Sequence, residues 1–205
     1  MRSVPKTLAG GLAVFLLAVG LAACGGSSGD SSSSSSTTEE SASSKQEAAE
    51  FVPKQHRDSG GGSSQYIVKG GDNSVQEFGE EADQQEFEAA AAVFHGFLDA
   101  RAEGDWAAAC EYMSKSIVES FEKVVSRSKQ AGGDSCAVTL EKLISPAAKG
   151  LMKTEAEKAD VGSLRVEGNR SFIIYTGDKG TVLAMPMQEE GGKWKVASVT
   201  GTPLQ

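Results

Sequence analysis

The 205-residue chain has few of the residues from which most catalytic and metal sites are built. It contains only two histidines, His56 and His95, and only three cysteines, Cys24, Cys110 and Cys136. Zinc sites need clusters of these residues at short, regular spacings, and no such spacing occurs here. Glycine-rich phosphate loops and dinucleotide-binding fingerprints are also absent from the sequence. We therefore expect neither a metal ion nor a cofactor.

Basic residues are scarce as well. The chain has 20 Lys and Arg against 28 Asp and Glu, which gives a formal net charge of −8. Proteins that bind nucleic acid depend on clustered Lys and Arg to neutralise phosphates. The excess of acidic side chains therefore excludes nucleic acid as an expected partner.

Long hydrophobic runs are missing except at the N-terminus. Residues 8–23 are almost entirely apolar and follow the basic residues Arg2 and Lys6. The run is short and rich in glycine for a membrane span, and it is typical of a secretory signal. We expect export of the chain and removal of residues 1–23 as a signal peptide.

The end of this run is Leu21-Ala22-Ala23-Cys24, followed by Gly25. It resembles the lipobox of bacterial lipoproteins, in which a leucine and two small residues precede a cysteine that receives lipid. The resemblance implies that Cys24 becomes the mature N-terminus. It would carry lipid, as diacylglycerol and palmitate, and anchor the protein on the extracytoplasmic face of the cell membrane. An ordinary signal cleaved after Ala-x-Ala and an uncleaved anchor are the alternatives.

Cleavage before Cys24 would leave 20 − 2 = 18 basic residues against 28 acidic ones, a net charge of −10 with neutral histidines. This charge offers no polybasic second membrane signal, so the anchor would depend on lipid alone. Assigning Cys24 to lipid leaves an even pair, Cys110 and Cys136, which should form a disulfide in an oxidising compartment. A redox-active pair is the alternative, but the Cys-x-x-Cys spacing is missing.

Residues 24–64 are rich in serine and glycine and include six consecutive serines, Ser31 to Ser36. A segment with so few large apolar residues cannot bury enough surface to offset the entropy of ordering it. We predict a disordered tether of about 40 residues, with a root-mean-square span on the order of 35 Å. His56 lies within it and is assigned no role. Residues 65–80 are predicted to form an extended arm that lies on the following domain.

Residues 81–205 predict one α+β domain, and its helices come first. Apolar residues at helical spacing indicate a long helix over 81–103 that ends at Gly104, and a second from Trp106 with Asp105 as its N-cap. A third is expected from Ser114, and a short fourth over about 135–144. Ser145-Pro146 ends the fourth helix, and the polar stretch 149–158 is assigned to no element.

The second half of the domain alternates apolar and polar residues with a period of two. Short connections that contain glycine separate four expected strands at 160–167, 171–176, 181–189 and 193–199, which form an antiparallel meander. Alternation places Met185 and Met187 on one face of the third strand, and Trp194 and Val196 on one face of the fourth, so that one side of the sheet can pack on the helices. Pro186 has no amide donor, which suggests an edge position or a bulge.

Two short motifs accompany this order of helices and strands: Gly104-Asp105-Trp106 between the first two helices, and Gly-Gly-Lys-Trp-Lys-Val over 191–196. Together they resemble the nuclear-transport-factor-2-like roll over residues 82–200. The resemblance implies helices packed on a strongly curved sheet, with a cone-shaped pocket between the sheet and the long helix. The group includes ketosteroid-isomerase-like and polyketide-cyclase-like enzymes and also many exported domains of no known chemistry. Fold alone therefore does not select a function.

The candidate catalytic residues are few. His95 and Asp99 are one helical turn apart and could act as a general base and its orienting carboxylate inside the cone. Tyr112 and Tyr175 are candidate hydrogen-bond donors opposite them. A histidine at the boundary of the apolar stripe, beside a surface aspartate, is the commoner outcome of this spacing. The large aromatic residues are expected in the core: Trp106, Trp194, Phe94 and Phe121.

We therefore expect a non-catalytic, lipid-tethered extracytoplasmic domain that binds an apolar small molecule, a wall component or another envelope protein. The rival hypothesis is a small-molecule isomerase or cyclase that acts in the cone. A purely structural subunit of an envelope complex is the third. One cavity shared by His95, Asp99, Tyr112 and Tyr175 would favour the enzyme, and a cone filled by side chains would favour a protein partner.

Overall fold

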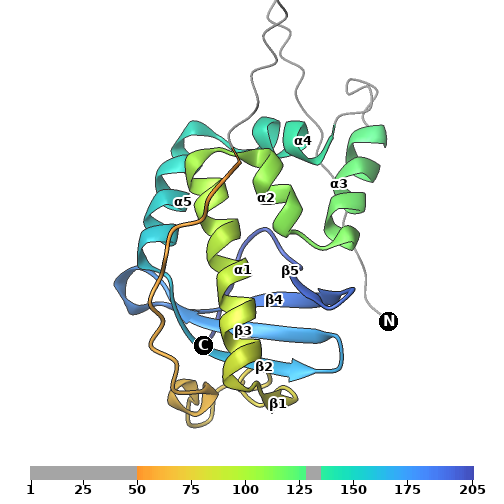
Figure 1. Ribbon diagram of the computed structural model, residues 1–205. Helices are drawn as coiled ribbons and strands as arrows, with labels where there is room; N and C mark the ends of the chain where they lie inside the picture. The colour runs from red at the N-terminus through yellow and green to blue at the C-terminus, as the bar shows by residue number, and fades with distance from the viewer. Residues whose placement is uncertain (1–49, 128–134) are drawn as a thin grey trace, which may run out of the picture. The chain divides into compact units, whose positions relative to one another are not determined.

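Five helices precede most of the sheet in the chain (Figure 1). This computed structural model describes residues 50–127 and 135–205, all of which belong to one unit, Glu47–Gln205. The predicted signal peptide, Cys24 and residues 24–49 of the predicted tether lie outside the described residues. Within the described ranges, no helix is long and apolar enough to cross a membrane.

The helices begin and end where local side chains satisfy their backbone ends. They are α1 (Gln84–Glu103), α2 (Trp106–Tyr112), α3 (Lys115–Arg127), α4 (Cys136–Leu143) and α5 (Pro146–Lys158). Asp83, Asp105 and Ser135 cap α1, α2 and α4 by accepting hydrogen bonds from backbone N–H groups. Gly104 ends α1 in the left-handed conformation. The four predicted helices are confirmed to within about three residues at their starts.

The helix α5 was not predicted. Ser145-Pro146 does end α4, but the same two residues also start α5, because Ser145 is its N-cap and Pro146 is its first residue. Only Met152 and Ala156 of this helix are buried. Two buried residues in thirteen make too thin an apolar stripe to be recognised among the lysines and glutamates.

The strands form one antiparallel sheet. The predicted meander is confirmed as β2 (Asp160–Glu167), β3 (Arg170–Thr176), β4 (Val182–Glu190) and β5 (Lys193–Val196). Two very short strands extend it: β1 (Glu80–Glu81) pairs with β2, and β6 (Thr202–Pro203) pairs with β4. The register of β2 against β3 shifts at Gly162, between Val161 and Ser163.

Pro186 lies within a central strand, and the predicted edge position or bulge is therefore wrong. It faces Phe172 of β3, and its carbonyl accepts a hydrogen bond from the N–H of Ala197 at 2.9 Å. Its nitrogen consequently also points away from β3, toward Ala197, which follows the last residue of β5. The pairing of β4 with β5 ends at Met187 and Val196, so no strand residue paired with β4 loses a hydrogen bond at Pro186.

The core lies between α1 and one face of the sheet. Phe94 and Phe97 of α1 meet Tyr175 of β3 and Met185 and Met187 of β4, and none of these five is more than 2% exposed. The Phe94 and Tyr175 rings are 4.7 Å apart between centroids. The volume between the sheet and the long helix is thus filled by large side chains.

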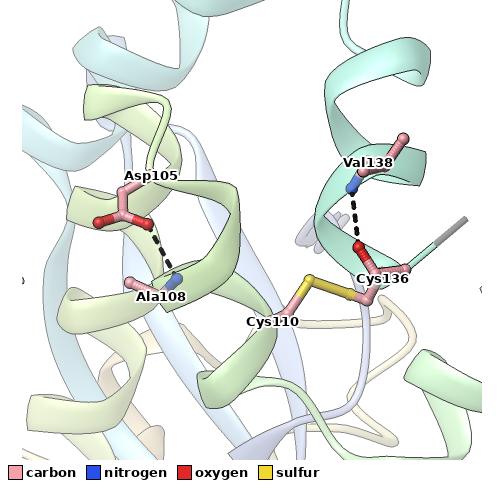
Figure 2. The surroundings of a disulfide bond; sticks show 6 residues. Asp105, Ala108, Cys110, Cys136 and Val138 are labelled. Carbon is pink, nitrogen blue, oxygen red and sulfur yellow. Dashed lines mark hydrogen bonds between the residues drawn. A yellow bond between two sulfur atoms is a disulfide. The ribbon is translucent and has the colours of Figure 1, made fainter. Parts of the chain in front are cut away.

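The predicted disulfide is present. Cys110 near the end of α2 is bonded to Cys136, the first residue of α4, with the two Cα atoms 6.2 Å apart (Figure 2). The bridge links helices that lie side by side, with α3 on the chain between them. The disulfide therefore forms a covalent loop of the chain that contains α3.

Candidate functional site

Residues 51–62, which we call the strap, lie along α1 and run antiparallel to it (orange in Figure 1). At the C-terminal end of α1, the Lys54 Nζ is 3.3 Å from Glu103. At the C-terminal end of the strap, the N–H of Gly62 donates to the carbonyl of Gly162 in β2 at 2.9 Å. Contacts with the domain thus begin at Phe51, which packs against the core, whereas the predicted tether ends at Ser64.

The glycines at the end of the strap allow it to bind to β2, although in the sequence they are typical of a flexible segment. Gly60, Gly61 and Gly62 all have positive φ, at 61°, 97° and 82°, a conformation that other residues rarely adopt. This turn lets Gly60 and Gly62 donate to the carbonyls of Val161 and Gly162. The strap is therefore joined to β2 by backbone hydrogen bonds as well as to α1 by side chains.

Two histidine–aspartate pairs connect the strap to α1. The Nε2 of His56 lies 3.0 Å from Oδ2 of Asp99, and the Nε2 of His95 lies 2.8 Å from Oδ1 of Asp58. The two imidazole rings are stacked, with centroids 4.0 Å apart and planes 4° from parallel. Each pair thus takes one residue from the strap and one from α1.

The spacing of the four residues explains the arrangement. His56 and Asp58 are two positions apart in an extended segment, which puts their side chains on the same side at a distance of about 7 Å along the chain. His95 and Asp99 are four positions apart on a helix and occupy one face, about one turn apart. Because the strap runs antiparallel to α1, His56 lies beside Asp99 and Asp58 lies beside His95.

The predicted pairing of His95 with Asp99 does not occur. Both side chains are buried, at 3% and 1% exposure, because the strap covers the face of α1 that the sequence suggests is solvated. Asp99 Oδ2 accepts hydrogen bonds from His56 and from the backbone N–H of Lys54, the latter at 3.0 Å. The Nδ1 of His95 and the Oδ1 of Asp99 have no hydrogen-bond partner among the described residues.

The electrostatics favour a charged carboxylate at Asp58. Burial raises the pKa of the Asp58 carboxyl, but hydrogen bonds from His95 and from the N–H of Val161, with the positive charge of His95 and His56, outweigh burial and hold that pKa below its ordinary value. A cavity of about 520 Å³ adjoins the cluster and is lined in part by His56, Asp58 and His95. Within the described part of the chain, no three His, Cys, Asp or Glu side chains are arranged to hold a metal ion.

Tyr175 lies apart from this cluster. Its hydroxyl donates to Oε1 of Glu155 at 2.9 Å, and Glu155 is also 3.6 Å from the buried guanidinium of Arg101. Burial and the negative charge of Glu155 raise the pKa of the Tyr175 hydroxyl above its ordinary range. The hydroxyl therefore stays protonated and donates a hydrogen bond to the partly buried carboxylate of Glu155.

Tyr112 lies on yet another surface, in what we call the α1–β5 groove. This hollow of about 550 Å³ lies between the first half of α1, the end of α2 and the β4–β5 hairpin. Its apolar lining consists of Ala89, Val93, Tyr112 and Trp194, and its charged lining of Asp83, Glu86, Glu111, Glu189, Lys193 and Lys195. The structure thus does not bring His95, Asp99, Tyr112 and Tyr175 into one cavity.

Gly96 makes room for Tyr112 in the groove. A Cβ atom added at Gly96 would lie 2.5 to 2.7 Å from three atoms of the Tyr112 ring and hydroxyl. A glycine in the middle of a helix is normally unfavourable, by about 1 kcal/mol relative to alanine. Its presence here follows from the close approach of the tyrosine to α1.

No protein-family model matches this chain, and no similarity to a curated protein or to a solved structure is found.

Sequence reasoning missed two of the four residues in the cluster, His56 and Asp58. Both lie in residues 24–64, whose serine- and glycine-rich composition predicts a disordered tether. One signal was present, since Phe51-Val52-Pro53 is the first group of apolar residues after Cys24 that could dock on a core. Such a group, followed by His56 and Asp58 at a spacing of two, indicates the start of an ordered segment.

Proposed function

We propose that the protein is a membrane-anchored extracytoplasmic lipoprotein, held by lipid on Cys24, whose domain binds another envelope protein and does not catalyse a reaction. The resemblance to the lipobox supports the anchor. The observation that carries the choice of a protein partner is the filled interior between α1 and the sheet, where Phe94, Phe97, Tyr175, Met185 and Met187 are fully or almost fully buried. A partner must then bind at the surface, where the α1–β5 groove is a hollow of about 550 Å³.

An apolar small molecule is the less favoured ligand. An apolar cavity lies between α2, α3, α4 and α5, where Trp106, Phe121 and Leu140 line about 150 Å³. Sites for drug-sized ligands usually measure about 300–1,000 Å³. This cavity is therefore small for such a ligand.

The isomerase or cyclase alternative gains no support from the geometry. Such a site needs an acid or base in the cone with donors opposite it. His95 and Asp99 instead bind the strap, and the Tyr175 hydroxyl is committed to Glu155. The candidate groups thus lie at three separate sites: His95 and Asp99 at the strap, Tyr175 at Glu155, and Tyr112 in the α1–β5 groove.

Two experiments test the proposal. Intact mass of the protein extracted from membranes should show acyl chains on Cys24, and Cys24→Ala should release or misprocess the protein. A photo-reactive residue at Glu111, in the groove, should crosslink a protein in intact cells, whereas the same residue at the exposed Glu157 of α5 should not. A soluble, unmodified mature form would contradict the anchor, and equal labelling from both positions would contradict a protein partner at the groove.

A further inference from the structure

We propose that the α1–β5 groove binds an extended, basic peptide segment of the partner protein, which adds to the free edge of β5. This inference rests on the proposed function and specifies the kind of partner. Three features of the groove carry it: an unpaired backbone edge, an excess of unpaired carboxylates, and an aromatic floor.

The unpaired edge is at Trp194. In an antiparallel hairpin, successive residues point their N–H and C=O groups alternately toward and away from the neighbouring strand. The carbonyl of Val196 accepts from the N–H of Ser114 at 2.8 Å, so Val196 faces away from β4, and Trp194, two residues earlier, faces the same way. Outside the sheet ladder, no backbone group of another described residue hydrogen-bonds to the N–H or C=O of Trp194. An extended peptide can pair with such a free edge.

The charges around the groove favour a basic segment. Glu86, Glu111 and Glu189 line it, and none of them forms an ion pair with another described residue. Of the two lysines in the lining, the ammonium group of Lys195 is held by the backbone carbonyl of Glu111. Lys193 and Lys195 together do not balance the four carboxylates of the lining, so lysine or arginine side chains of a partner would meet complementary charge.

The floor of the groove suits the other side chains of such a segment. Side chains of an extended peptide alternate between two directions, so that every second one would face the floor formed by Val93, Tyr112 and Trp194. Aromatic rings accept apolar side chains and also the faces of cations. A segment that alternates apolar and basic residues therefore fits both the floor and the carboxylates.

Binding can be measured with Trp194 itself. Trp106→Phe leaves Trp194 as the single tryptophan of the chain. The full-length protein, purified in detergent, would be titrated with a ten-residue peptide of alternating lysine and valine. Matched peptides would carry glutamate in place of lysine, or a central proline that removes a backbone donor. We expect a saturable change in Trp194 emission with the lysine peptide only, weakened by salt. If Trp106→Phe fails to fold, the same titration on the wild-type protein by calorimetry gives the same comparison.

A charge-matched pair of variants decides whether the groove is the site. The groove variant is Glu86→Gln with Glu111→Gln and Glu189→Gln. The control is Glu77→Gln with Glu141→Gln and Glu157→Gln, three exposed residues outside the groove lining. We expect the groove variant to bind the lysine peptide roughly tenfold more weakly and the control to stay within about twofold. Equal losses, equal binding of the glutamate peptide, or no saturable binding would overturn the inference.

The two proposals fail in different ways. If the photo-reactive residue at position 111 crosslinks a protein in cells, and does so equally well when Glu86→Gln and Glu189→Gln are added, the basic-peptide inference is wrong while the proposed function stands. If no protein is crosslinked and Cys24 carries no lipid, the proposed function is wrong.

Discussion

At the scale of single side chains, two carboxylates hold three segments of the chain together. Asp58 accepts hydrogen bonds from His95 of α1 and from the N–H of Val161 in β2, and Asp99 accepts two from the strap. Hydrogen bonds to charged groups stabilise by more than neutral ones, about 1.5–3 kcal/mol each. Small changes at these positions should therefore have measurable effects.

Replacing His56 should loosen the strap. His56→Ala removes one partner of the buried Asp99 carboxylate, and we expect a loss of about 1–2 kcal/mol in the free energy of unfolding. Hydrogen exchange of the strap amides, such as Lys54 and Gly62, should accelerate while exchange in β3 changes little. Lys69→Ala, at an exposed position beyond the strap, serves as the control. Unchanged strap exchange in His56→Ala would show that the histidine does not hold the segment.

The lowered pKa of Asp58 predicts a loss of stability in acid. Because the folded protein holds this pKa below the ordinary value of 3.8, the carboxylate stabilises the fold above that value. The contribution disappears as the pH falls through the lower, folded pKa. Denaturant unfolding between pH 3 and pH 7 should therefore show a gap between wild type and Asp58→Asn that narrows toward pH 3. Asp178→Asn, which is exposed, should show no such gap, and a constant gap for Asp58→Asn would contradict the assignment.

Two glycines in helices should respond oppositely to alanine. At Gly150 of α5 an added Cβ meets nothing within 4 Å, so Gly150→Ala should stabilise the protein by up to about 1 kcal/mol. At Gly96 the Cβ would collide with Tyr112, so Gly96→Ala should instead destabilise it, by about 1–3 kcal/mol. Thermal unfolding measures both. A stabilised Gly96→Ala would mean that Tyr112 does not lie against α1.

At the scale of elements, the disulfide holds α2 and α4 together on either side of α3 in the chain. Closing a loop of about 25 residues should stabilise by roughly 3 kcal/mol in the chain-entropy model. Cys110→Ser with Cys136→Ser should lower the free energy of unfolding by about this amount, and reductant should lower the stability of the wild type but not of the variant. Non-reducing peptide mass spectrometry provides the check on pairing, and two free thiols in the exported protein would contradict it.

Elements with strong local signals were predictable from the sequence, and elements that depend on tertiary contacts were not. The helix α1 has a full apolar stripe and a glycine end, and the hairpins of the meander have short turns with glycine, so both follow from local chemistry. The helix α5 buries only Met152 and Ala156, and the strap has no periodic pattern. The cluster of His56 with Asp99 joins residues 43 positions apart, and no local spacing reveals such a pairing.

At the scale of the whole molecule, the strap should determine how far the domain extends from the chain that precedes it. Asp58→Ala with Asp99→Ala removes both carboxylates and should free about a dozen residues. Small-angle scattering of the full-length protein should then give a larger radius of gyration than that of the wild type. The control is Asp72→Ala with Asp178→Ala, two exposed aspartates away from the strap, which should leave the radius unchanged. An equal radius in all three proteins would show that the strap stays docked without its carboxylates.

The antiparallel course of the strap also gives the domain a polarity. The chain reaches the domain beside the C-terminal end of α1 and is bonded to the C-terminal half of that helix, whose 20 residues span about 30 Å, before it reaches β2. If the protein is anchored at Cys24, as proposed, the chain from the anchor joins the domain at the C-terminal end of α1 while the strap is docked. When the strap is released, that chain joins the domain near Ser63, beside β1. The two histidine–aspartate pairs would therefore set which end of the domain is joined to the chain that leads to the anchor.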